Sequence, residues 1–69
     1  MSLHTRRRAE FVTSLTATGM DEIRANESAR LWEYEANRRG LDQAAATFWT
    51  EARVFVDELA ERDRLTLAD

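Results

Sequence analysis

Carboxylates are the most numerous side chains in this sequence that could do chemistry. The chain has 13 acidic residues but a single histidine, His4, no cysteine and no lysine. A di-metal site in a helical bundle needs glutamates together with Glu-x-x-His pairs, and the sequence has no such pair. Zinc sites use clustered cysteine and histidine, and Schiff-base chemistry needs lysine. We therefore expect no metal site, no cofactor and no catalytic residue, and a protein that is not an enzyme.

Three consecutive arginines near the start, Arg6, Arg7 and Arg8, could contact phosphates. A small nucleic-acid-binding regulator that uses them is the alternative function. Positive charge at a helix N-terminus opposes the helix dipole and calls for compensation. Acidic residues late in the chain could supply it in an antiparallel dimer: Asp57, Glu58, Glu61 and Asp63. Since the net charge is −3, no overall field attracts nucleic acid, and we favour a solvated or ion-paired surface.

The two tryptophans, Trp32 and Trp49, are the other residues with binding potential. They could form a stacking platform, or they could lie in the core or at a subunit seam, where their large areas contribute most. We favour packing, because both lie on stripes that also contain alanine. Their indole N–H groups would need acceptors, which nearby carboxylates could supply: Glu33, Glu35 and Glu51.

Two glycines divide the chain into the elements that must position these side chains. Gly19 is followed by Met20-Asp21, and Gly40 by Leu41-Asp42. Glycine readily ends a helix, and aspartate after an apolar residue readily begins one. The repeated signal predicts three helices, at about 4–18, 22–39 and 43–64.

Apolar spacing supports the two longer helices. Ala25, Ala29, Trp32 and Ala36 recur at helical intervals on the second, and Ala45, Phe48, Ala52, Phe55 and Leu59 on the third. Val54 falls outside that stripe. Small residues facing large ones allow close helix packing, and loops of one to three residues make neighbouring helices antiparallel. We predict an all-α, antiparallel three-helix bundle in which helices 22–39 and 43–64 form a hairpin core, with an extra N-terminal helix.

A chain of 69 residues is one small domain that buries only about 60% of its unfolded surface. Without disulfides, association is the remaining way to complete its core. We therefore predict a cytoplasmic protein–protein interaction module, either self-associating or an accessory subunit, with no membrane partner. Its expected anchors are Trp32, Trp49, Phe55 and Leu59.

The stretch from Ile23 to Arg53 resembles the short bacterial domains called domain of unknown function 2934. The similarity is carried by Ile23-Arg24, Ala29, Leu31-Trp32-Glu33, Trp49 and Glu51-Ala52. This chain departs from that family in two places. Its loop lacks the proline and the additional glycine that the family usually has, and its spacing from Ile23 to Trp32 also differs. The resemblance implies a helical hairpin and no known activity.

Overall fold

Three α-helices make up the computed structural model, which describes residues 2–68, with residues 65–68 described as backbone only. They are α1 (Leu3–Ala17), α2 (Glu22–Arg39) and α3 (Phe48–Ala68). The part of the chain described contains no strand. The predicted all-α class is confirmed.

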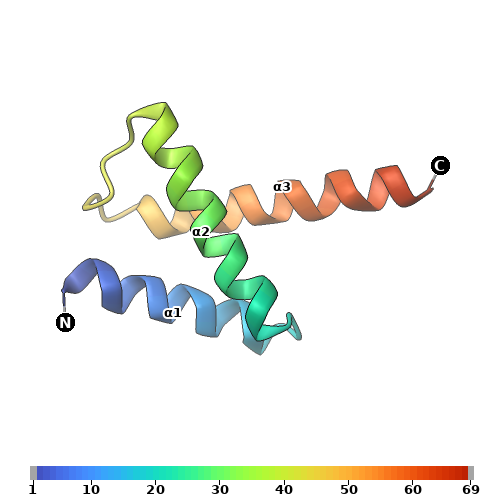
Figure 1. Cartoon of the computed structure of the whole chain (residues 1–69), viewed down its shortest axis with the longest axis horizontal. Coiled ribbons are helices and arrows are strands. Elements are labelled where there is room, and N and C mark those ends of the chain that lie inside the picture. Colours follow the sequence, from blue (N-terminus) through green and yellow to red (C-terminus); the bar gives the residue numbers. More distant parts are fainter. Residues whose placement is uncertain (1, 69) are drawn as a thin grey trace.

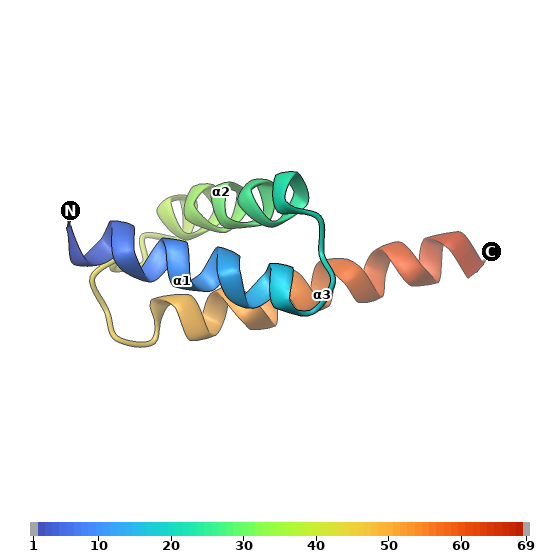
Figure 2. The same cartoon turned by 90° about the horizontal axis from the view of Figure 1, so that it is seen from below.

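The helices form a small bundle in which α2 is antiparallel to its two neighbours. In Figures 1 and 2, α1 and α3 run in the same general direction, while α2 returns across them at an oblique angle. Because α2 and α3 cross rather than align, their ends diverge on both sides of the crossing. This divergence determines where the surface is open.

The first Gly-apolar-Asp signal works as the sequence predicts. Gly19 adopts a positive φ of 98°, and the Asp21 side chain caps α2 by accepting a hydrogen bond from the Ile23 N–H at 3.1 Å. At the other end of α2, Gly40 has a φ of 74°, and the Leu41 N–H donates to the Ala36 carbonyl at 2.9 Å. This is a left-handed glycine cap, so α2 has the predicted bounds.

The second signal ends α2 but does not begin α3, which starts at Phe48 rather than at about residue 43. The Asp42 carboxylate instead accepts a hydrogen bond from the Ala44 N–H at 2.9 Å, and the Ala45 N–H donates to the Asp42 carbonyl. These local bonds close turns and give the backbone an alternative to a helix. The connection 40–47 is therefore longer than predicted, and α3 continues to Ala68 instead of about residue 64.

All three helices contribute to the core. Its members alternate between small and large, as expected: Phe11, Leu15, Ala25, Ala29, Trp32, Ala36, Phe48, Ala52 and Val56. Two of them come from α1, so α1 completes the core to which α2 and α3 contribute the other members. Because alanines line much of the inner face of α2, large side chains from both neighbours reach the same centre.

The distal half of α3 extends beyond the rest of the bundle (Figures 1 and 2). Every side chain from Ala60 to Arg64 is exposed. The radius of gyration is 12.5 Å, whereas a compact domain of this length has about 11 Å. The chain is therefore more extended than a closed three-helix bundle.

Replacing Leu15 by alanine tests whether α1 belongs to the cooperative core. Leu15 is 1% exposed, so we expect the free energy of unfolding to fall by about 2–5 kcal/mol, measured by urea titration. Val54→Ala is the control, because Val54 is 55% exposed and should cost less than about 0.5 kcal/mol. Equal effects of the two substitutions would contradict the packing described.

Candidate functional site

Trp32 lies in the core of the single chain. Its side chain is 1% exposed, and its ring centroid is 5.4 Å from those of Phe48 and Phe55. A residue this buried has almost no surface to offer a partner, so its predicted role as an anchor is corrected to that of a packing residue. The same burial argues against a stacking platform made by both tryptophans.

Trp49 lies between α1 and α3 and is partly buried. Its ring contacts Phe11 at a centroid distance of 5.1 Å and meets Phe48 edge to face at 5.0 Å. Trp49 joins the start of α3 to α1 and keeps some exposed surface.

The indole N–H groups do not receive the acceptors that we predicted. Neither tryptophan Nε1 has a hydrogen-bond partner among the described residues. Glu33 and Glu35 are engaged elsewhere, because Glu33 binds α1 and Glu35 pairs with Arg38 and Arg39. Glu51 lies on the exposed face of α3. The predicted acceptor role of these glutamates is therefore wrong.

A charged cluster that the sequence did not reveal joins α1 to α2. Glu33 on α2 receives hydrogen bonds from Arg8 Nε at 2.8 Å and from His4 Nε2 at 2.9 Å. His4 and Arg8 lie one turn apart on α1, a spacing that could have marked a shared face. Their partner lies 25 residues further along the chain, and no local pattern identifies it.

The pKa of Glu33 is lowered by this arrangement. Partial burial alone would raise it, but the hydrogen bonds from Arg8 and His4 and the positive charge of Arg8 outweigh that effect. The ionised carboxylate is therefore the form that the fold favours.

The Glu33 cluster involves only one of the three consecutive arginines. Arg8 is committed to Glu33, whereas Arg6 and Arg7 have no acidic partner among the side chains that the structure describes. The late acids of α3 do not compensate them within one chain. Because α1 and α3 run in the same direction, those acids lie toward the opposite end of the molecule (Figure 2).

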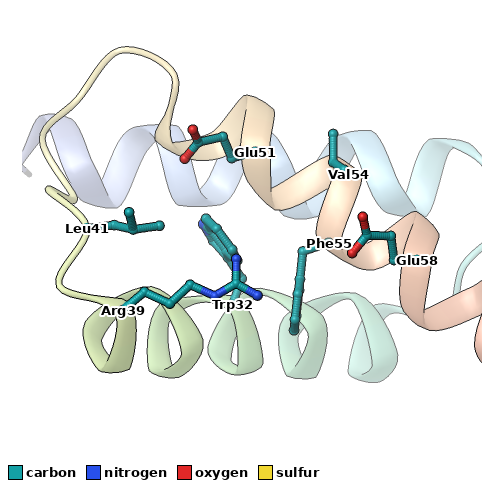
Figure 3. Close-up of a pocket in the computed structure, with 7 residues that line it drawn as sticks. All are labelled: Trp32, Arg39, Leu41, Glu51, Val54, Phe55 and Glu58. Carbon is teal, nitrogen blue, oxygen red and sulfur yellow. The ribbon is translucent and has the colours of Figure 1, made fainter.

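The candidate interaction site is a groove between the end of α2 and the first half of α3, which we call the α2–α3 groove. It has a volume of about 310 Å³ and is shown in Figure 3; its lining residues are Trp32, Arg39, Leu41, Glu51, Val54, Phe55 and Glu58. Phe55 contributes aromatic surface, the buried Trp32 forms part of the wall beneath, and Leu41 enters from the connection 40–47. Sequence reasoning identified Phe55 but missed Leu41 and Val54, since both lie off the predicted stripes.

Leu59 lines a second, smaller hollow of about 210 Å³ on the other side of the α2–α3 crossing. It lies there beside Leu31, which is 39% exposed. The four predicted anchors are therefore not brought together. Phe55 and Leu59 do line one further hollow together, but Trp49 packs toward α1 and Trp32 is internal.

No group of three or more histidine, cysteine or acidic residues within the described part of the chain could hold a metal ion. None of the described helices combines the length and apolar character that crossing a lipid bilayer requires.

No protein-family model matches the chain, and comparison with curated proteins and with solved structures finds no significant match. The resemblance to domain of unknown function 2934 therefore stays a prediction. The function of this chain must therefore be inferred from the chemistry of its own surface.

Replacing Glu33 by glutamine should destabilise the protein in a pH-dependent way. Because the folded-state pKa of Glu33 is lowered, its stabilising effect is present above the unfolded pKa and is lost as pH falls through the folded value. The side chain remains 26% exposed, so we expect a cost of about 1 kcal/mol at pH 7, or about 4–8 °C in Tm.

The difference in Tm between wild type and Glu33→Gln should shrink strongly at pH 3, as followed by circular dichroism. Glu10→Gln serves as the control on the exposed side of α1. A deficit of the same size at both pH values would show that the charge of Glu33 is not what stabilises the contact.

Proposed function

We propose that this protein is a non-enzymatic helical interaction module that self-associates through the α2–α3 groove. The observation that carries the proposal is an open groove with aromatic lining, whose margin includes Val54 at 55% exposure and Leu41 at 36%. Apolar surface that one chain leaves exposed in a concave site is typical of protein interaction surfaces. The polar groups of the groove are one arginine and two glutamates, a set that lacks a nucleophile paired with a base.

The surface area of the chain supports association. It exposes 5142 Å² at a mass of 8.0 kDa, whereas a compact monomer of that mass exposes about 4,450 Å². The excess of about 700 Å² is close to the roughly 800 Å² per partner that a stable interface buries. A partner on the groove would restore the burial that a compact protein of this size achieves.

The projecting half of α3 gives independent support. Short helices without tertiary contacts are marginal in water, because their stability comes mainly from packing. Among the side chains described, the last core residue of α3 is Val56, and the exposed stretch from Ala60 to Arg64 lies on the half of α3 that has no helix beside it in Figure 1. A partner seated along α3 would supply the missing contacts.

Binding of nucleic acid is the second candidate, and the observation that favours it is that Arg6 and Arg7 pair with no acidic side chain among those described. We rank it lower because Arg8 is committed to Glu33 and the net charge is −3. This candidate predicts strongly salt-dependent binding to DNA or RNA that Arg6→Ala/Arg7→Ala removes. An absence of binding at low salt would exclude it.

Sedimentation velocity tests the main proposal. We expect wild type to associate at tens of micromolar and Val54→Arg to remain monomeric, since a guanidinium in the groove would lose hydration on docking. Ile23→Arg is the matched control, because Ile23 is 79% exposed and does not line the groove. A wild-type chain that stays monomeric and folded throughout this range would overturn the proposal.

A further inference from the structure

The α2–α3 groove carries two glutamates that form no ion pair with any side chain the structure describes. Glu51 and Glu58 lie two turns apart on α3 and line the groove together with Phe55. The arginine that the groove does contain, Arg39, donates to Glu35 at 2.9 Å, so its charge is engaged by α2.

The start of α1 presents the opposite charge. Arg6 is exposed and lies off the face that carries the buried Phe11 and Leu15, as does Leu3, which is 59% exposed. Arg7 lies one turn before Phe11 and is half-buried at the edge of that face. The first turn of α1 has no acidic residue. The positive end of the helix dipole therefore adds to two cations that pair with no described acidic side chain, which makes an acidic partner favourable.

We propose that the α2–α3 groove of one chain binds the first turns of α1 from a second copy, with Arg6 and Arg7 paired to Glu51 and Glu58. This inference rests on the proposed self-association and names the surface that enters the groove. Each copy supplies both the groove and the basic turn, so a two-fold dimer makes the contact twice.

Arginine suits this groove for chemical reasons. Its planar guanidinium can pair with a carboxylate through two parallel hydrogen bonds while its flat face lies on an aromatic ring. In Figure 3 the Glu58 carboxylate lies beside the ring of Phe55, while Glu51 lies on the side of Trp32 and the connection 40–47. The aliphatic part of the arginine side chain would cover apolar surface that a shorter cation would leave open.

A charge-swap experiment tests the pairing directly. Arg6→Glu/Arg7→Glu and Glu51→Arg/Glu58→Arg should each weaken self-association at least about tenfold, because like charges then meet in both contacts. Mixed in equal amounts, the two variants should form a heterodimer with an affinity within about threefold of wild type, because both of its contacts again join opposite charges. Sedimentation velocity measures all three samples.

Two controls separate charge pairing from a general effect of net charge or of misfolding. Arg24→Glu/Arg30→Glu changes the net charge as much as the α1 variant does but alters exposed residues of α2 outside the groove and the α1 turn, so it should leave association nearly unchanged. The fourfold variant that combines both swaps should regain self-association. Circular dichroism at the working temperature establishes that each variant is folded.

The outcomes distinguish this inference from the proposed function. A monomeric wild type would overturn both. If wild type associates but the mixed variants do not recover affinity, or if the control weakens association equally, the groove–α1 pairing is wrong while self-association stands.

Discussion

The indole of Trp32, packed where α2 crosses α3, is the contact on which the rest of the structure depends. Phe48 and Phe55, two turns apart on α3, each lie 5.4 Å from it between ring centroids. Ala29 and Ala36 are fully buried beside it and allow the helices to approach. A large ring among small residues fixes the position of the crossing. It also limits how far the two helices can pack along their lengths.

The consequences of that crossing extend to both ends of the molecule. On one side the helix ends separate and leave the α2–α3 groove; on the other, α3 continues past the bundle. The helix α1 packs Phe11 and Leu15 into the centre, and the His4–Glu33–Arg8 cluster fastens its start to α2. The core is small and lies around the crossing of α2 and α3 at Trp32. The parts of the helices that are far from this crossing therefore pack against one neighbouring helix or none.

Local signals predicted the features that depend on local physics. The bounds of α2 follow from the cap at Asp21 and the left-handed glycine at Gly40, and both act within one helical turn. The alanine and aromatic spacing likewise identified most of the core. The start of α3 was missed because residues 43–47 favour a helix by composition, while the Asp42 turns and the path between the two crossing helices decide otherwise. The groove and the Glu33 cluster depend on residues far apart in sequence, which no periodicity brings together.

The turns that replace the predicted helix at residues 43–47 also leave the groove open. An α3 that began at residue 43 would add about 7 Å of helix before Phe48, where Leu41 and the connection now border the groove. The turns at Asp42 instead lead the chain around the end of α2 and leave aromatic surface uncovered between the helices. A marginally sized chain thus gives up internal burial in the groove lined by Glu51 and Glu58, neither of which pairs with another described side chain. Arg6 and Arg7, which pair with no described acidic side chain, lie on the same polypeptide as the groove. Each chain therefore carries both the groove and the basic surface that we propose binds it. We infer that association completes the fold as well as carrying the function.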